Sequence, residues 1–504
     1  MERVLNAVER LAAADPSRPA VIDELVFHTY GELHDRAGRR ACALQTFGLR
    51  SGDEVMILLP NGTEFVELLI AAVRARLVPF LLHTEFTADD ISALASETRA
   101  KALITSPETA VTLESELKGQ LQVISIDNVY SPNFPDVQLP PYNASPCDLV
   151  FFTSGSSGKP KGAVVPGAAF NMVMPREVEN RKAKAHLLCR PLYFRAHLTA
   201  VCSILQEGNT IVLSRQAEPE RWMDIIRKYQ VSFVNTGPND LQRWLDYLDA
   251  SGEAFPESIE HMMSTGAPLT NVLKRRIAQK LPHVRVTDLY GSSEAGAIAM
   301  IASDEWEGKE GSCGKPLFFN KVTIADEHGK ELGVGEVGEI TVSSRYLMRG
   351  YYRADSMKNG GEDGVRTGDL GYFDDEGYLY IVGRINRVIQ CGGFPVIPEE
   401  VEQVLREYPS VLEAAVIGMR DPERGNLPYA IVRSDERIGK GRNKEEKDML
   451  ARELLMHCRS RLEPYKVPTA VYFVQDIPLN HAGKTNYREL VRRLAHEVTS
   501  GEWG

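Results

Sequence analysis

Apolar residues recur every three or four positions at the start of the chain, a spacing that places them on one face of a helix. The residues of this face are Val4, Leu5, Val8 and Leu11. We therefore expect an amphipathic helix over residues 4–14. The apolar segments that follow alternate between short, strand-like runs and longer, helix-like runs, at 26–30, 33–46, 55–59 and 65–73. Strands that alternate with helices predict parallel α/β layers.

A proline-rich stretch at 131–146 is typical of an extended connector. It leads into an apolar run at 149–152, which predicts a buried strand. Further α/β units follow, with a predicted strand, helix and strand at 210–213, 220–229 and 231–234.

The pattern changes twice in the last third of the chain. Between residues 321 and 343, short alternating runs separated by glycines predict an antiparallel β subdomain. After Arg384 the rhythm changes again, and the remainder is long enough for a small domain. Its predicted elements are a β-hairpin, a helix at 398–407, strands at 412–419 and 429–433, a helix at 445–461 and a strand at 470–474.

These patterns predict the α/β fold class. We expect a large N-terminal domain at 1–384, made of layered α/β subdomains plus a β subdomain. A small α+β domain would occupy 385–504.

Composition narrows the possible functions. The chain has 504 residues, 43% hydrophobic and 25% charged, which indicates a globular protein of two or more domains. Its net charge of −11 disfavours a nucleic-acid-binding protein, which usually has a basic face. The seven cysteines include no Cys-x-x-Cys pair, so we expect reduced thiols, a cytoplasmic location and no zinc site. The sequence shows neither a signal peptide nor an apolar stretch that could span a bilayer.

One stretch joins the end of an apolar strand to a run of hydroxyls, glycines and lysines. It covers residues 151–162 and reads Phe-Phe-Thr-Ser-Gly-Ser-Ser-Gly-Lys-Pro-Lys-Gly. Glycines allow close approach of the backbone, and successive N–H groups form an anion-binding concavity, so the loop suits a polyphosphate. It is not a Walker loop, because Pro160 follows Lys159. The alternative is a plain surface turn, which fits less well because the run adjoins an apolar strand.

Five more segments contain candidate site residues, and in two of them the residue types suit nucleotide chemistry on their own. A carboxylate such as Glu294 suits a hard cation held by phosphates. An aromatic face such as that of Tyr290 suits a purine. An ionised Asp369 can accept hydrogen bonds from two neighbouring hydroxyl groups. The segments are Ser264-Thr265-Gly266-Ala267-Pro268-Leu269, Asp288-Leu289-Tyr290-Gly291-Ser292-Ser293-Glu294, Arg366-Thr367-Gly368-Asp369, Gly383-Arg384-Ile385-Asn386-Arg387 and Pro478-Leu479-Asn480-His481-Ala482-Gly483-Lys484-Thr485-Asn486-Tyr487-Arg488.

In this order, and over nearly the whole chain, these segments resemble the motifs of the adenylate-forming superfamily. That superfamily includes acyl- and aryl-CoA ligases, peptide-synthetase adenylation domains and luciferases. The resemblance implies that Glu294 holds Mg²⁺, Ser293 touches the α-phosphate of ATP and Lys484 is the catalytic lysine. The residues that it places around the nucleotide are Thr153, Ser154, Gly155, Ser156, Ser157, Gly158, Lys159, Gly266, Ala267, Asp288, Tyr290, Gly291, Ser292, Asp369 and Arg384.

The reaction implied by the resemblance has two steps. A substrate carboxylate attacks the α-phosphorus of ATP, pyrophosphate leaves, and a thiol then displaces AMP from the acyl-adenylate. In the family the small domain swings about a hinge between the steps. Asn386 stands at that hinge, where relatives carry Asp or Lys, and Asn tolerates turn conformations. The swing would replace Lys484 with the Gly392-Gly393 loop, which looks more like that of CoA ligases.

The residues expected around the acid are Phe194, Arg195, Asn235 and Thr236. Phe194 takes the place of a histidine common in CoA ligases. Arg195 falls where amino-acid-activating modules place an aspartate, and a cation cannot bind an ammonium group, so an α-amino acid is disfavoured. Either Arg195 faces the acyl group and pairs with an acidic or hydroxylated substituent, or it points away into a salt bridge.

Three functions stay open at this point. The first is an ATP-dependent ligase that joins a small carboxylic acid to CoA, the acid being an aryl acid, a hydroxyaryl acid or another small acid that is not an α-amino acid. The second is a stand-alone adenylating enzyme that loads the phosphopantetheine of a carrier protein. The third is a non-catalytic nucleotide-binding relative, which would be expected to have lost Lys484, Glu294 or Asp369.

Overall fold

The computed structural model describes residues 1–24, 26–129, 148–154, 160–171, 184–215, 218–353, 364–391, 394–421, 425–434, 444–479 and 485–500. The chain forms two compact units. The first comprises Met1–Val322 and Thr341–Thr367, and the second comprises Thr323–Ile340 and Gly368–Gly504. Each is described by itself below.

One sheet of the first unit has the strand order β18-β8-β7-β4-β3-β5-β6. Strands β4, β3, β5 and β6 are parallel, and β7 joins them parallel to β4. Strand β8 is antiparallel to β7, and β18 is antiparallel to β8. The strands are β3 (Glu54–Leu58), β4 (Val78–Leu81), β5 (Ala102–Thr105), β6 (Gln122–Ser125), β7 (Asp148–Ser154), β8 (Pro160–Pro166) and β18 (Gly350–Tyr351).

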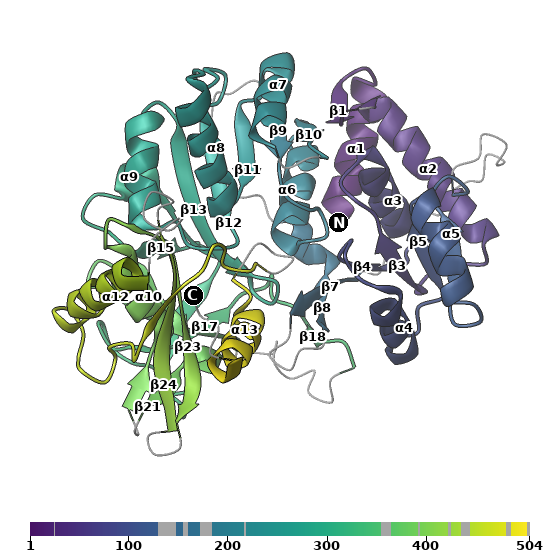
Figure 1. Ribbon diagram of the computed structural model, residues 1–504. Helices are drawn as coiled ribbons and strands as arrows, with labels where there is room; N and C mark the ends of the chain where they lie inside the picture. Colours follow the sequence, from purple (N-terminus) through teal and green to yellow (C-terminus); the bar gives the residue numbers. More distant parts are fainter. Residues whose placement is uncertain are drawn as a thin grey trace. The chain divides into compact units, whose positions relative to one another are not determined.

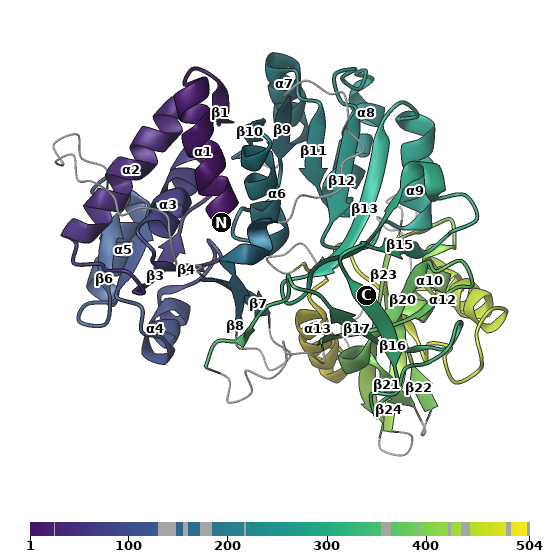
Figure 2. The same ribbon diagram turned by 180° about the vertical axis from the view of Figure 1, so that it is seen from behind.

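Helices cover both faces of this sheet because its strands are apolar on both sides. In β3, Val55 and Ile57 join a core with α1, α2 and α3, whereas Met56 and Leu58 join a separate core with α4 and α5. Figure 2 shows α1 lying beside α2. The helices are α1 (Glu2–Ala14), α2 (Tyr30–Thr46), α3 (Thr63–Arg74), α4 (Ala88–Glu97) and α5 (Pro107–Glu116).

The other strands of the first unit have the order β2-β1-β10-β9-β11-β12-β13-β14-β15. Strands β1, β10, β9, β11, β12 and β13 run parallel, and β14 turns back antiparallel to β13. Their bounds are β1 (Pro19–Ile22), β2 (Phe27–Thr29), β9 (Ala185–Leu188), β10 (Thr210–Leu213), β11 (Phe233–Thr236), β12 (His261–Thr265), β13 (Arg285–Ser292), β14 (Gly296–Ala302) and β15 (Ser312–Pro316).

Four helices accompany these strands. Helices α7, α8 and α9 lie side by side along the sheet (Figure 1). Helix α6 contacts α1 and the β13 and β14 strands, and its Leu198 and Val201 share the core of α1 and α2. Helix α6 therefore links the β13–β14 pair to the rest of the first unit. The helices are α6 (Arg195–Gln206), α7 (Pro219–Tyr229), α8 (Pro238–Ser251) and α9 (Asn271–Lys280).

The chain next forms strands in the order β16-β17-β19-β20, with β19 and β20 antiparallel. Beyond them lies a sheet in which β23 and β24 form a long antiparallel pair. Alternate residues of β23 face two cores: Ala414 and Val416 pack with α10 and α12, and Ala415 and Ile417 pack with α13. Figure 1 shows α10 and α12 on one side of this pair and α13 on the other.

The elements of this part of the chain are β16 (Lys321–Ala325), β17 (Gly338–Ser343), β19 (Val365–Phe373), β20 (Leu379–Arg384), a short 3₁₀ helix at Ile385–Arg387, β21 (Ile389–Cys391), β22 (Phe394–Val396), α10 (Pro398–Arg406), β23 (Val411–Asp421), β24 (Gly425–Ser434), α12 (Lys444–Arg459), β25 (Val471–Phe473) and α13 (Tyr487–Ser500).

The predicted fold class is confirmed, since α/β layers, an antiparallel β region and a small α+β region follow one another along the chain. The strand predicted at 231–234 begins two residues later, at Phe233. The connector predicted at 131–146 lies outside the described residues. The predicted domain boundary between residues 384 and 385 stays a prediction. Within the described ranges, no helix is long and apolar enough to cross a bilayer.

Candidate active site

A tight turn between β13 and β14 carries the residues predicted to meet phosphate and metal. The strand pairing slips between Tyr290 and Gly291, and a side chain on Gly291 would collide with the carbonyl of Gly296. Gly296 has a φ of +77°, a value that favours glycine. The Ala295 N–H donates to Ser292 Oγ at 3.0 Å. The glycines and this hydrogen bond fix the turn, which holds Ser293 and Glu294 half-buried.

The Glu294 carboxylate is held through one of its oxygens. Tyr351 donates its hydroxyl to Glu294 Oε1 at 2.8 Å. Burial, followed by the charge of Glu294, raises the pKa of Tyr351, so its hydroxyl stays a donor. Within the described part of the chain, Glu294 Oε2 accepts no hydrogen bond. Mg²⁺ is commonly held by one or two carboxylates plus substrate phosphates, so Glu294 fits this ion.

The segment around Tyr351 also reaches the predicted phosphate loop. Strand β18 pairs with β8, with Tyr351 opposite Ala163, and the Tyr352 N–H donates to the Gly162 carbonyl at 2.7 Å. Strand β8 follows the loop directly. Its partner β7 contains Thr153 and Ser154, opposite Lys161 and Pro160. The loop residues themselves, Gly155, Ser156, Ser157, Gly158 and Lys159, lie outside the described residues.

The residues predicted around adenine come together on neighbouring strands. Ser264 of β12 is in register with Asp288 of β13. The Leu269 N–H donates to Asp288 Oδ2 at 3.2 Å, which ties the loop of Gly266 and Ala267 to β13. Gly266 has a φ of +96° and is exposed. Burial raises the pKa of Asp288 to about 6, although the charge of Lys274 opposes the shift.

Tyr290, the predicted adenine-packing residue, lies half-buried on β13 beside this loop. The structure thus brings Gly266, Ala267, Asp288 and Tyr290 together through one strand pair, and Gly291 and Ser292 follow on the same strand.

The residues predicted around the acid lie at the starts of α6 and α8. Phe194 precedes α6 half-buried, with its ring 4.8 Å from that of Tyr193 and 5.2 Å from that of His83. Asn235 and Thr236 end β11 and are buried. Asn235 Nδ2 and Thr236 Oγ1 find no hydrogen-bond partner among the described residues.

Arg195 is buried, with 4% of its surface exposed, and its guanidinium is committed to main-chain oxygens. Nη1 donates to the carbonyls of Ser293 at 2.6 Å and Glu294 at 3.1 Å, and Nη2 donates to the carbonyl of Tyr346. Among the described residues no carboxylate forms an ion pair with it. Neither of the two sequence interpretations described this arrangement, and a contact between Arg195 and the acid stays a prediction.

In the second unit, the two residues predicted to meet the nucleotide lie opposite each other. Asp369 of β19 is in register with Arg384 of β20, and Arg384 Nε lies 2.8 Å from Asp369 Oδ1. Asp369 is buried, whereas the Arg384 side chain is half exposed. Gly368 has a φ of +74°, and its N–H donates to Glu339 Oε1 at 3.1 Å. The hairpin therefore holds both side chains at one place.

Lys484 and the Gly392-Gly393 loop lie outside the described residues. The ends of the Lys484 segment are fixed, because Leu479 and Thr485 form a β-bridge and the Asn486 N–H donates to the Pro478 carbonyl at 2.7 Å.

The predicted hinge residue, Asn386, lies in the short 3₁₀ helix Ile385–Arg387. The next residue, Arg387, is anchored to Glu399 at 2.5 Å and to Glu402 at 2.7 Å. The chain is therefore fastened into the second unit immediately after the predicted hinge.

Sequence reasoning missed two features of this site. Tyr351 belongs to a Gly-Tyr-Tyr run that resembles the family, but no role was assigned to its hydroxyl, because a donor to Glu294 is not visible in that pattern. Tyr346 contributes only its carbonyl, which any residue would supply, so no sequence signal exists for it.

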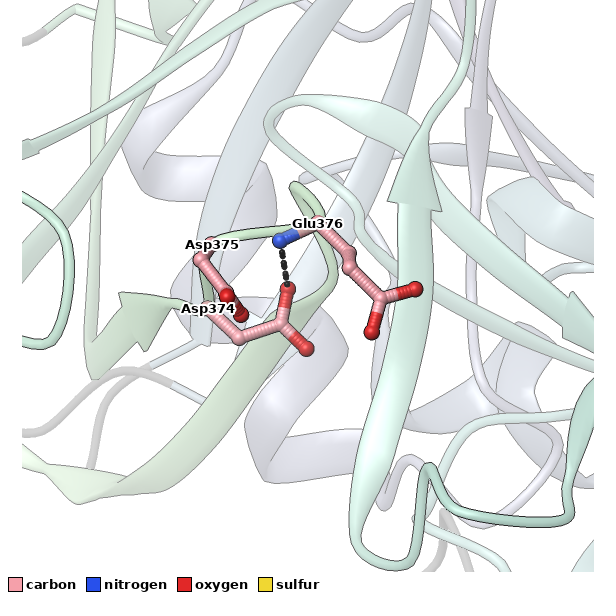
Figure 3. Close-up of side chains that lie close together, drawn as sticks. All are labelled: Asp374, Asp375 and Glu376. Atoms are coloured by element: carbon pink, nitrogen blue, oxygen red, sulfur yellow. Dashed lines mark hydrogen bonds between the residues drawn. The ribbon is translucent and has the colours of Figure 1, made fainter.

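A cluster of three acidic side chains lies in the β19–β20 turn of the second unit (Figure 3): Asp374, Asp375 and Glu376. Asp374 Oδ1 accepts hydrogen bonds from the Glu376 and Tyr378 N–H groups. The position of Asp374 is therefore explained by the turn that it shapes, and the other two side chains are exposed.

Comparison with known proteins agrees with these motifs. Residues 8–352 match the family described as AMP-binding enzyme, and residues 400–484 match its C-terminal domain. The chain is 31% identical to 2-succinylbenzoate–CoA ligase of Bacillus licheniformis, covering 95% of this chain and 98% of that protein. It is 30% identical to 4-coumarate-CoA ligase 1 of Narcissus pseudonarcissus, covering 96% and 92%.

A solved structure is similar over the same length. The o-succinylbenzoate CoA synthetase of Bacillus subtilis, in complex with its acyl-adenylate intermediate, superposes with a TM-score of 0.83 at 26% identity, covering 96% of this chain and 97% of that one. The same enzyme has been solved with ATP and a magnesium ion. On this evidence the chain belongs to the AMP-binding enzyme family, within the adenylate-forming superfamily of acyl- and aryl-CoA ligases.

Proposed function

We propose that this protein is an AMP-forming ligase that joins an aryl carboxylic acid to CoA. The observation that carries the proposal is the connection between Glu294 and the phosphate loop. Tyr351 holds Glu294 Oε1 with its side chain and pairs through its backbone with the strand that follows the loop. A metal ligand joined in this way to the strand that follows the predicted phosphate loop suits a nucleoside triphosphate with its Mg²⁺.

The first step forms the acyl-adenylate. An oxygen of the acid attacks the α-phosphorus of ATP, and the bond to pyrophosphate breaks. Such a displacement depends on positioning and on charge neutralisation. We assign Glu294 to the Mg²⁺, which offsets charge on the phosphates, and Ser293 and Lys484 to the α-phosphate. Asp369 would accept hydrogen bonds from the ribose hydroxyls, with Arg384 beside it, and Tyr290 would pack on adenine.

The second step transfers the acyl group to sulfur. The thiol of CoA attacks the carbonyl carbon of the acyl-adenylate, AMP leaves with its phosphate oxygen, and a thioester remains. In our proposal the part of the chain after Arg384 rotates about Asn386 between the steps. The double anchorage of Arg387 by Glu399 and Glu402 supports a pivot on its N-terminal side.

The acid is proposed to be an aryl acid with a polar substituent. Two of the relatives act, by their names, on 2-succinylbenzoate and 4-coumarate, both of which are aryl acids. In this chain, Asn235 Nδ2 and Thr236 Oγ1 are buried without a partner among the described residues. Buried polar groups are nearly always hydrogen-bonded, so a polar group of the substrate would satisfy them. A cytoplasmic location is proposed as well, because the six described cysteines are all free.

Pyrophosphate release from ATP and MgCl₂ tests the proposal. The panel of acids would contain 2-succinylbenzoate, 4-coumarate, ferulate, benzoate, a fatty acid and an α-amino acid, each with and without CoA. We expect release with an aryl acid, stimulation by CoA and loss in Glu294→Gln, which keeps an acceptor for Tyr351. If CoA did not stimulate pyrophosphate release but a phosphopantetheinylated carrier protein did, the acceptor would be the carrier protein and not CoA. No release with any acid would contradict the proposal.

A further inference from the structure

Arg195 is a buried cation that forms no ion pair with a carboxylate in the described part of the chain. Only 4% of its surface is exposed, and burial lowers its pKa to about 10 while the charge of Glu294 partly opposes that shift. It is also the first residue of α6, where the helix dipole disfavours a positive charge. A buried charge is costly unless it is paired, so this position calls for a compensating role.

The guanidinium joins three separate segments of the first unit. It extends from α6, donates to Ser293 and Glu294 in the β13–β14 turn, and donates to Tyr346 at the start of the segment that leads into β18. These segments are far apart in sequence. The planar fork of an arginine can serve several carbonyl groups at once, which a lysine does less well.

A main-chain hydrogen bond also links the β13–β14 turn to the segment that leads into β18. The Met348 N–H donates to the Glu294 carbonyl at 2.8 Å, so this oxygen accepts from both Met348 and Arg195. Gly296 leaves room for the guanidinium, because a Cβ there would lie 3.0 Å from Arg195 Nη2. The backbone of the turn is thus shaped around Arg195.

We propose that Arg195 is a positioning residue for adenylate formation, which clamps the Ser293–Glu294 turn to the Tyr346–Tyr352 segment and places a positive charge behind the turn. The clamp fixes where Ser293 and Glu294 meet the nucleotide. The positive charge of Arg195 would also offset part of the negative charge of the phosphates. This inference rests on the proposed function for its catalytic consequence, but the clamp itself is a property of the free protein.

The test uses Arg195→Met, Arg195→Lys and, as a matched control, Arg40→Lys. Arg40 is an equally buried arginine, 3% exposed, that lies in α2 and pairs with Glu67. Pyrophosphate release gives kcat and the KM values for ATP and for the acid. We expect Arg195→Met to lower kcat about 100-fold, with the KM of the acid within about threefold of wild type. Arg195→Lys should recover about tenfold of that loss, because it restores the charge and some donors.

Two kinetic outcomes would overturn the proposal. If Arg195→Met raised the KM of the acid and left kcat unchanged, Arg195 would contact the acyl group instead. If Arg195→Met retained the wild-type kcat, no positioning would be needed. Should Arg195→Met fail to fold, Arg195→Lys decides: a lowered kcat with unchanged KM of the acid supports the clamp, and wild-type kinetics contradict it.

Hydrogen exchange of the free protein separates this claim from the proposed function. The amides of Ala295 and Met348 should exchange about tenfold faster in Arg195→Met than in wild type, and should be unchanged in Arg40→Lys. Exchange that matches wild type would overturn the clamp, whatever reaction the enzyme catalyses. Faster exchange in a protein that releases no pyrophosphate with any acid would keep the clamp and reject only the proposed function.

Discussion

Two buried arginines of the first unit, Arg40 and Arg195, differ in what surrounds their charge. Both are almost fully buried, and both donate to main-chain carbonyls, Arg40 to that of Ile126 at 3.0 Å. Arg40 Nε also lies 2.6 Å from the Glu67 carboxylate. Arg195 has no carboxylate partner among the described residues.

Arg40 has a buried carboxylate as its direct partner. Glu67 is fully buried and meets Arg40, Arg36 at 2.7 Å and His28 at 2.9 Å. This network holds α2 and α3 together. Because Glu67 supplies the negative charge beside Arg40, no external anion is needed there. A charge that the fold neutralises is structural, whereas a charge that the fold leaves unpaired indicates where a ligand of opposite sign belongs.

The largest expected effect concerns the paired charge. Arg40→Met leaves Glu67 buried with fewer partners, so we expect the first unit to lose about 3–5 kcal/mol of free energy of unfolding, the usual result of breaking a buried ion pair. Equilibrium urea unfolding at pH 7 measures it. Activity of the molecules that remain folded should stay near the wild-type value. A loss of stability no larger than that of an exposed substitution would contradict the distinction.

The pH dependence of stability sharpens the same point. Burial by itself would raise the pKa of Glu67, but the contact with His28 and the charges of Arg40 and Arg36 outweigh it and lower this pKa from 4.5 to about 2. The ionised carboxylate therefore stabilises the fold above pH 4.5, and this contribution disappears as the pH falls through 2.

Comparison of wild type with Glu67→Gln measures this contribution. The difference in free energy of unfolding should narrow by about 3 kcal/mol between pH 5 and pH 2. A difference that stays constant over this range would show that Glu67 is not held ionised by its partners.

Gly296→Ala disturbs the position of the Arg195 guanidinium without removing its charge. The added methyl group would lie 3.0 Å from Arg195 Nη2, on a residue with a φ of +77°. The strain of a non-glycine residue there is on the order of 1–2 kcal/mol, and we expect kcat to fall about tenfold. Gly308→Ala, at a φ of +73° with no atom near the added methyl group, is the matched control and should leave kcat unchanged. Equal effects of both substitutions would attribute the loss to backbone strain alone.

The smallest expected effect concerns the hydroxyl that orients Glu294. Tyr351→Phe removes one hydrogen bond to Glu294 Oε1, which is worth about 1 kcal/mol. We expect the Mg²⁺ concentration at half-maximal activity to rise about fivefold, with the KM of the acid unchanged. Tyr352→Phe, which removes a hydroxyl contact to Glu54, is the control. An unchanged requirement for Mg²⁺ in Tyr351→Phe would remove Tyr351 from the metal site.

Much of this arrangement was predictable from the sequence, for physical reasons. Apolar periodicity gave the layers, because a helix face and a strand face must both be buried. The strand predicted at 210–213 coincides with β10. The strand predicted at 231–234 starts two residues too early compared with β11, because an apolar run does not show at which residue strand pairing begins. The nucleotide motifs were found because they are contiguous along the chain, as Asp288 to Glu294 is.

Arg195 shows what a sequence cannot supply. Its residue type was singled out, but its partners are carbonyl groups of Ser293, Glu294 and Tyr346, and every residue carries a carbonyl group. The clamp is visible only in the fold, which brings Arg195, the Ser293–Glu294 turn and Tyr346 together from distant parts of the chain.

The most direct test of an unpaired charge that acts through the Ser293–Glu294 turn is a double-mutant cycle on single-turnover acyl-adenylate formation. It combines Arg195→Met with Glu294→Gln, and the parallel cycle combines Arg40→Met with Glu294→Gln. If Arg195 works by positioning Glu294, the Arg195→Met/Glu294→Gln protein should be little slower than Glu294→Gln alone, with a coupling of about 2 kcal/mol. The Arg40 cycle should be additive within about 0.5 kcal/mol. Additive losses in both cycles would contradict the account.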